Sequence, residues 1–248
     1  TSPTLLLIKG IFLAFISIGI PLGIAGLALP NRHLFNAALL LGCLGIVLLF
    51  YSLTGLYRQY GPPAINYFRK LLSMENINGL IALADIHIGT YRHSYKLAEA
   101  LPQAKIYSID YWDESWPMPE LAIQDVRDLE FAPANHGKIY PTKAEQGRIP
   151  LDNESCDAVV LGFGTHEINA NGSREKLFEE VKRILKPGGK ILMFEHGYDF
   201  HNYLIFGPVI YHVTKLKDWI HLLDVHFVNV KKTKTSYAVN LLSATKNG

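Results

Sequence analysis

Two pairs of ionisable residues follow apolar runs in the second half of the chain. His166 and Glu167 come after one β-branched run, and Glu195 and His196 come directly after another. Imidazole and carboxylate groups can remove or hold a proton, and histidine suits that task near neutral pH. We therefore take these four residues as candidate catalytic groups, with His166 as the first choice for a base or for orienting a substrate. A structural role, in which they cap a helix and tie loops together, stays open for each.

The segments around these pairs have the pattern of a strand, a helix and a strand. Residues 158–161 and 190–194 are short apolar runs typical of buried strands. Between them, apolar residues recur at helical spacing from Leu177 to Leu185, and the run KPGG at 186–189 should end that helix. Such a unit is right-handed and parallel, and ligands bind at the carboxyl ends of its strands.

This stretch resembles the second half of class I S-adenosylmethionine (SAM) methyltransferases. The similarity lies in DAVV at 157–160 and in RILKPGGK at 183–190, each next to a strand pattern. The two ionisable pairs make it similar to the group that includes ubiquinone and menaquinone C-methyltransferases. The resemblance covers roughly residues 78–245. It implies an α/β fold with a Rossmann-like sheet of seven strands, the last one antiparallel, and SAM as the cofactor.

The remaining elements of that domain are expected from periodicity and turn residues. The predicted strands lie at 80–84, 105–109, 137–140, 225–230 and 237–244, and the predicted helices at 91–101, 120–129 and 215–223. Residues 231–236 have the composition of a hairpin turn between the last two strands.

In the resembled family, an Asp at a strand end precedes a GxGxG turn that lets the backbone approach SAM. Asp85, Gly89 and Thr90 match that pattern. His87 and Tyr91 stand where glycines are usual, which is a departure, because glycine permits close approach and positive φ. We include His87 among the candidate cofactor residues, since it would reshape this turn.

The resemblance places further cofactor contacts after the next strands. Asp110 matches the acidic residue that accepts both ribose hydroxyls, although an Asp that caps a turn would look the same. Tyr111 is a candidate surface for stacking on adenine. Lys143 and Ala144 resemble the loop along the adenine edge, although the family often has Asp in place of Lys143. Gly162 would pass under the methionine part.

Two long apolar runs precede this domain, at 10–29 and 34–57. Both runs are long enough to cross a bilayer, which takes about 20 residues. We expect a two-helix transmembrane hairpin in residues 1–60, with a pair of buried helices as the alternative. The basic residues favour a two-pass topology with the large domain on the cytoplasmic or organelle-matrix side.

Residues 61–77 would link the hairpin to the methyltransferase-like domain at 78–248. Ile65, Phe68 and Leu71 give this juxtamembrane segment an amphipathic helix. The helix either lies on the membrane or covers the sheet as an ordinary first helix.

Composition excludes several other classes. The net charge of +2 is too small for a nucleic-acid-binding protein. Both cysteines sit in apolar runs, so no disulfide framework is indicated. Five histidines could converge on one sheet edge, but no HxxxH or HxH pair has ligand spacing, and we expect no metal site. These histidines are His87, His166, His196, His201 and His212.

The sequence thus predicts a membrane-anchored SAM-dependent methyltransferase that acts on a hydrophobic acceptor such as a quinone, a phenol or a lipid. Residues 200–212, aromatic and nearly uncharged, would form a lid over that acceptor or simply pack on the sheet. The alternative is a catalytically inactive methyltransferase-like subunit of a membrane protein complex. The enzymatic interpretation requires Asp85, Asp110, His166 and Glu195 to gather along one edge of the sheet.

Overall fold

The structure, a computed structural model, describes residues 21, 24–25, 32–79, 81–112, 127, 132–133, 136–168, 173–236 and 238–248. The first apolar run and the helix expected at 120–129 therefore lie almost entirely outside the described residues. The two-helix hairpin and the domain boundaries at 60 and 77 stay predictions.

The large domain is built on one sheet of seven strands in the order β3-β2-β1-β4-β5-β7-β6. The first five strands are parallel, and β7 runs antiparallel to β5 and to β6, as the resemblance implies. The strands are β1 Ala82–His87, β2 Lys105–Asp110, β3 Ile139–Lys143, β4 Cys156–Gly162, β5 Leu185–His196, β6 Val228–Lys234 and β7 Val239–Thr245.

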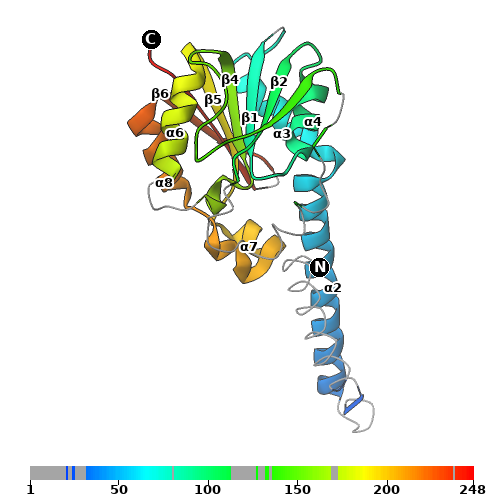
Figure 1. Ribbon diagram of the computed structural model, residues 1–248. Helices are drawn as coiled ribbons and strands as arrows, with labels where there is room; N and C mark the ends of the chain where they lie inside the picture. Colours follow the sequence, from blue (N-terminus) through cyan, green and yellow to red (C-terminus); the bar gives the residue numbers. More distant parts are fainter. Residues whose placement is uncertain are drawn as a thin grey trace.

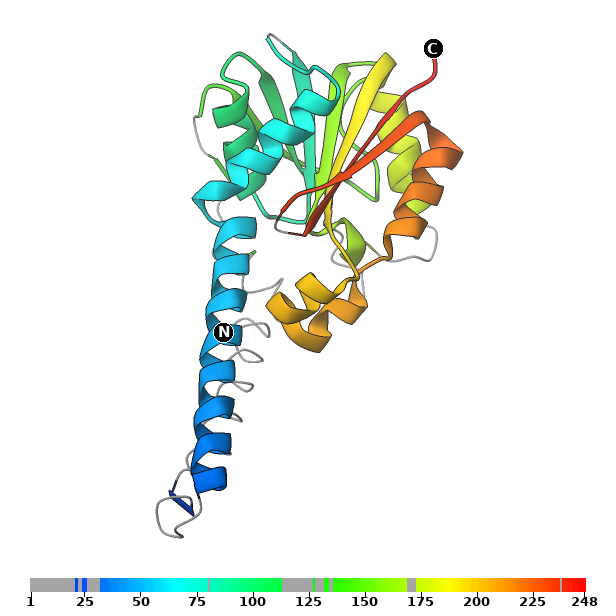
Figure 2. The ribbon, with the colours of Figure 1, turned by 180° about the vertical axis from the view of Figure 1, so that it is seen from behind.

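Helices cover both faces of this sheet (Figures 1 and 2). Helices α3 Ile65–Met74 and α4 Arg92–Ala100 cover one face, and α6 Ser173–Ile184 and α8 Leu216–His226 cover the other. Helices α3, α6 and α8 each bury an apolar face, whereas the buried face of α4 combines His93 and Ser94 with two apolar residues.

The structure decides between the two interpretations of the segment after residue 60. Phe68 and Leu71 are buried in the core between α3 and the sheet. The apolar face of this helix is therefore unavailable to a membrane, and the prediction that it lies on the bilayer is wrong.

Several predicted element boundaries differ from the observed ones. β1 runs through His87 rather than ending before Asp85, so two residues assigned to the cofactor turn belong to the strand. The segment 231–234, predicted as a turn, is part of β6, because α8 continues to His226 and delays the strand.

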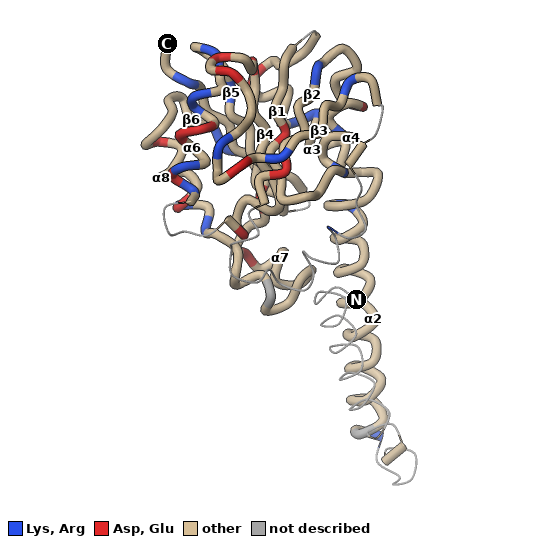
Figure 3. Tube along the Cα trace, viewed as in Figure 1, with Lys and Arg blue, Asp and Glu red and all other residues tan. Residues whose placement is uncertain are grey.

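Helix α2, Arg32–Tyr60, extends away from the sheet (Figure 1). Its segment Phe35–Tyr60 is long and apolar enough to cross a membrane. Figure 3 shows charged residues concentrated on the sheet domain and nearly absent from this helix. The short helices α7 Phe200–Phe206 and η3 Gly207–His212 lie beside its C-terminal half.

Candidate active site

The carboxyl ends of four neighbouring strands meet at one edge of the sheet. The strand register pairs His87 with Asp110 across β1 and β2, and Gly162 with Phe194 across β4 and β5. The residues that follow these positions must therefore lie close together.

Asp85 does not present its side chain at this edge. The carboxyl group lies between β1 and α4, where the Ser94 hydroxyl donates a hydrogen bond of 2.5 Å to Oδ2. Oδ1 is buried and has no hydrogen-bond partner among the described residues. Burial raises the pKa of Asp85 to about 7, against a smaller lowering by the Ser94 hydrogen bond. The expectation that Asp85 joins the other three residues on the rim is wrong, because β1 is longer than predicted and this side chain faces α4. Asp110, His166 and Glu195 do follow the carboxyl ends of β2, β4 and β5, so three of the four residues meet the condition set by the sequence.

His87 turns its ring inward and supports the cofactor turn. Its Nδ1 accepts the Gly89 amide hydrogen at 3.0 Å, so in the neutral ring Nε2 carries the proton and donates to Ser108 Oγ at 2.9 Å. Burial lowers the pKa of His87 to about 4, which keeps the ring neutral. Gly89 has a φ of 91°, a value that favours glycine. His87 therefore replaces the usual glycine without projecting over the turn.

Asp110 ends β2 and is held by an arginine. Arg127 donates from Nη1 to Oδ1 and from Nη2 to Oδ2, each at 3.0 Å. The same guanidinium donates to the Ile88 carbonyl at 2.6 Å and lies against Gly89. Arg127 thus bridges the cofactor turn and the carboxylate that should receive a ribose.

The other candidate cofactor residues lie around this turn. Tyr111 is buried and donates to the Gly147 carbonyl at 3.0 Å, and Ala144 is buried beside it in the same core cluster. Lys143 is exposed at the end of β3. Thr90 has a buried hydroxyl with no hydrogen-bond partner among the described residues. The Gly162 Cα packs against the Phe194 ring, which any side chain at this position would displace.

Both predicted catalytic pairs come together beyond β4 and β5. His166 and Glu167 lie on η2 Thr165–Glu167, and His166 Nδ1 is 3.0 Å from Glu195 Oε2. Its Nε2 is 3.3 Å from Glu167 Oε1, which is also 3.2 Å from His212 Nε2. The segment that carries His212 thus reaches the sheet edge.

Charge pairing sets the protonation of this cluster. Burial alone would lower the pKa of His166, but the carboxylates of Glu195 and Glu167 outweigh it and raise the pKa to about 9. Burial would raise the pKa of Glu167, but hydrogen bonds from His166 and His212 bring it to about 2. His166 is therefore an imidazolium at neutral pH in this arrangement, which suits orientation of a substrate better than proton removal.

Glu195 and His196 each have one buried polar atom that lacks a partner within the part of the chain that the structure describes, near the carboxyl ends of β4 and β5. Glu195 Oε1 and His196 Nδ1 have no hydrogen-bond partner among the described residues. The other ring nitrogen of His196 is 2.7 Å from the Tyr60 hydroxyl, and the ring stacks on Phe163 with centroids 4.1 Å apart. Burial, with the nearby His166 and His212, holds the pKa of His196 well below its usual value, so the ring is neutral.

The sequence did not single out Arg127 or Tyr60, because each is one residue in a segment without a motif. Of the five histidines that could converge, His166, His196 and His212 do so. His87 instead contacts Ser108, and His201 contacts Tyr51 on α2.

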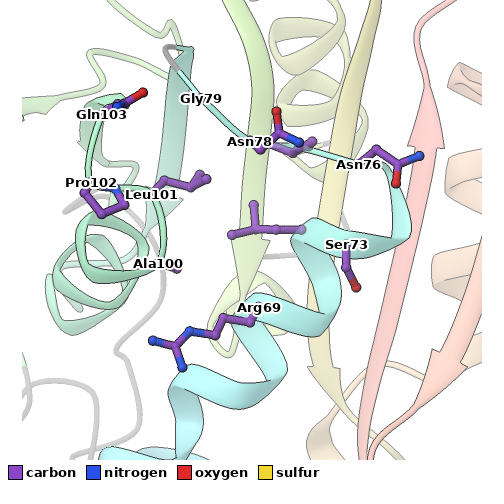
Figure 4. Close-up of a pocket in the computed structure, with 11 residues that line it drawn as sticks. Arg69, Ser73, Asn76, Asn78, Gly79, Ala100, Leu101, Pro102 and Gln103 are labelled. Atoms are coloured by element: carbon purple, nitrogen blue, oxygen red, sulfur yellow. The ribbon is translucent and has the colours of Figure 1, made fainter.

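A pocket of about 430 Å³ lies at the opposite, amino-terminal edge of the sheet (Figure 4). It is open to solvent between the ends of α3 and α4 and is lined by residues such as Arg69, Asn78 and Gln103. None of the candidate site residues lines it.

Residues 84–193 match the family model for the methyltransferase domain. This segment is a class I SAM-dependent methyltransferase domain. The methyltransferase domain is 29% identical over 113 residues to the ubiquinone/menaquinone biosynthesis C-methyltransferase UbiE of Syntrophotalea carbinolica, an alignment that covers 46% of this chain and 43% of that protein. It is 28% identical over 114 residues to the demethylmenaquinone methyltransferase of Geobacillus sp., covering 45% and 43% of the two chains. The chain thus spans less than half the length of these curated relatives.

The fold of the methyltransferase domain is shared with solved structures. A SAM-dependent methyltransferase from Aquifex aeolicus superposes with a TM-score of 0.56 at 19% identity, covering 77% of this chain and 93% of that one. At this identity the likeness concerns the fold alone.

SAM is the cofactor of this family, and the residues present fit it with one obstacle. Gly89 has the positive φ of such a turn, and the Thr90 hydroxyl and the Asp110 carboxylate flank it, but Arg127 covers the face of Gly89 that a ligand would approach. Two vicinal hydroxyls match the two oxygens of Asp110. Arg127 already uses both oxygens, so a ribose and Arg127 compete for the same carboxylate.

Proposed function

We propose that this protein is a membrane-anchored methyltransferase that transfers a methyl group from SAM to a hydrophobic acceptor of the quinone, phenol or lipid class. The observation that carries the proposal is the hydrogen bond of 2.7 Å between Tyr60 and His196. Tyr60 is the last residue of the apolar helix α2, and His196 ends β5 at the candidate active site. The end of the proposed anchor and the edge of the sheet that carries the candidate active site are therefore in direct contact.

Further contacts join α2 to residues 200–212, the segment that contains α7 and η3. Ser52 donates to the Ile205 carbonyl at 2.6 Å, and Gln59 donates to the Asn202 side chain at 3.1 Å. Large side chains nearby remain exposed on this segment, among them Phe200 and Tyr211. Aromatic residues next to a spanning helix suit the headgroup layer of a bilayer. This arrangement supports entry of the acceptor from the lipid.

The residues at this edge of the sheet would have separate roles in a methyl transfer. SAM, when bound, supplies an activated methyl group. Asp110 would hold its ribose, and the chain would mainly position the two reactants and exclude water. Glu195 Oε1, buried and unpartnered among the described residues, is placed to accept the hydrogen of an acceptor hydroxyl. His166 holds the other oxygen of that carboxylate in place.

The test is transfer of labelled methyl from SAM to quinol or phenol acceptors by the full chain in nanodiscs. Asp110→Ala should abolish SAM binding, whereas Glu195→Gln should abolish transfer and leave SAM binding intact. If the folded protein binds SAM but methylates water-soluble phenols as well as lipophilic ones, the membrane-acceptor assignment is wrong.

A second candidate function is a catalytically inactive subunit of a membrane complex. The bidentate Arg127–Asp110 pair favours it, because that pair closes the ribose position. Titration with SAM and with its demethylated product separates the two functions. Absence of a heat signal and of a melting shift for both compounds would favour the structural role.

A further inference from the structure

Three potential metal ligands meet between η2 and η3. The facing atoms are His166 Nε2, Glu167 Oε1 and His212 Nε2, which all lie within 4.8 Å of one another. We propose that these residues bind one divalent first-row transition-metal ion, with Zn²⁺ as the representative. The assignment concerns binding and does not depend on which acceptor is methylated.

The two distances to Glu167 match the spacing of ligands around one ion. Glu167 Oε1 lies 3.3 Å from His166 Nε2 and 3.2 Å from His212 Nε2. Charge-assisted hydrogen bonds between such groups are shorter, about 2.7–2.9 Å. Two ligands of one tetrahedral zinc, each about 2.0–2.1 Å from the ion, are about 3.3 Å apart. The two histidine nitrogens lie within 4.8 Å of each other, and two ligands at about 2.1 Å from one ion are at most about 4.2 Å apart, so any excess must close through rotation of the His212 side chain.

The far side of His166 has the partner that a ligating histidine needs. Nδ1 faces Glu195 Oε2 at 3.0 Å, and Glu195 is 1% exposed. A proton on Nδ1 donated to that carboxylate leaves the Nε2 lone pair directed at Glu167 and His212. Metal-binding histidines regularly donate their other nitrogen to a carboxylate in this way.

The backbone that carries two of the ligands is fixed by Arg174. This side chain donates to the His166 carbonyl at 2.6 Å and to the Ile168 carbonyl at 2.8 Å. Its positive charge acts on Glu195 and Glu167, among other nearby carboxylates. Once the proton on His166 has been displaced and both histidines are neutral, the site therefore keeps a net negative charge. A divalent cation would be attracted to this site.

His212 supplies both the third ligand and a route of entry. Its side chain is 33% exposed, so an ion can reach the site without opening the sheet domain. Three protein ligands leave room for a further, non-protein ligand, as in open zinc sites. The sequence did not reveal this set of three ligands, because His166 and Glu167 are adjacent and His212 lies on a distant element.

The experiment is calorimetric titration of the metal-stripped full chain, in detergent at mildly alkaline pH, with Zn²⁺, and absorption spectroscopy with Co²⁺. The alkaline buffer is chosen because a metal ion must displace the proton on His166. We expect one ion per chain, a rise in melting temperature and a visible Co²⁺ band. His212→Ala and, separately, Glu167→Gln should each weaken binding by at least about tenfold and remove the band.

The matched control is His221→Ala, which removes an exposed histidine of α8 outside the cluster and should leave binding unchanged. Melting curves without metal show whether each variant folds. Equal Zn²⁺ affinity in wild type and in both folded ligand variants, or binding lost equally in the control, would overturn the assignment.

Discussion

Arg127 and Asp110 form a two-pronged ion pair in which both carboxylate oxygens are used, each at 3.0 Å. The pair is mostly shielded from solvent, with the two side chains 22% and 9% exposed. If Asp110 receives the ribose of SAM, as we propose, cofactor binding must displace the arginine from these oxygens.

Replacing Arg127 by Gln should therefore tighten SAM binding. A hydrogen bond to a charged group contributes about 1.5 kcal/mol or more, which corresponds to about a tenfold lower Kd. Titration calorimetry of wild type and variant measures the change. The control is Arg148→Gln, an exposed arginine on a nearby loop, which should leave the Kd unchanged. Weaker binding by Arg127→Gln would mean that the arginine assists the cofactor instead.

The raised pKa of Asp85 predicts an unusual pH dependence of stability. Between its ordinary value of 3.8 and about 7, the unfolded chain has lost this proton while the folded protein retains it. The contribution of Asp85 to the free energy of unfolding therefore falls as pH rises through that window. Asp85→Asn stays neutral, so relative to wild type it should gain up to about 4 kcal/mol at pH 8 and little at pH 4, since folding raises the pKa from 3.8 to about 7 and one pKa unit is worth about 1.4 kcal/mol.

Denaturant unfolding across this pH range tests that expectation. Asp157→Asn is the control, because the pKa of Asp157 is shifted in the opposite direction to that of Asp85. The ammonium of Lys186 and the Ala82 amide outweigh the effect of burial and lower the pKa of Asp157. The stability linked to this lowered pKa is gained below about pH 4, so Asp157→Asn should be less stable than wild type by a nearly constant amount from pH 4 to pH 8. A gap between Asp85→Asn and wild type that does not grow with pH would show that Asp85 is ionised in the fold.

Much of the fold could be predicted, because apolar periodicity records which residues are buried. The run at 158–161 and the stop at KPGG located β4, α6 and β5 to within a few residues. The length of β1 could not be predicted, since His87 and Asp85 are atypical in a strand and are accommodated only by Ser94 and Ser108.

The candidate site was predicted only where it follows strand ends. His166 and Glu195 come from neighbouring parallel strands, so their meeting follows from topology. Tyr60 and Arg127 reach the site from segments whose position depends on tertiary packing. His212 was named among the histidines that could converge, but nothing in the sequence set it apart from His87 and His201, which do not. Nothing local to such residues encodes the contact.

Loss of the Tyr60 hydroxyl should weaken the contact between the apolar helix α2 and the end of β5. Tyr60→Phe removes the hydrogen bond to His196, which costs about 1 kcal/mol of stability. We expect a raised KM for a lipophilic acceptor with an unchanged Kd for SAM. Tyr57→Phe on the same helix is the control, because Tyr57 is exposed, and it should behave as wild type. Equal acceptor kinetics in the two variants would exclude a role for the Tyr60 contact.

Two glycines of α2 offer a matched test of how this helix holds α7. A Cβ atom at Gly55 would lie 2.5 Å from Ile205, whereas a Cβ at Gly42 meets nothing within 4 Å. Gly55→Val should therefore overpack the contact, cost about 1–3 kcal/mol and loosen α7. Gly42→Val should do neither. Hydrogen exchange of the α7 amides in nanodiscs measures the loosening. Because α7 leads into η3, Gly55→Val should also weaken any Zn²⁺ binding through His212. Equal protection of α7 in both variants would show that α2 does not position this segment.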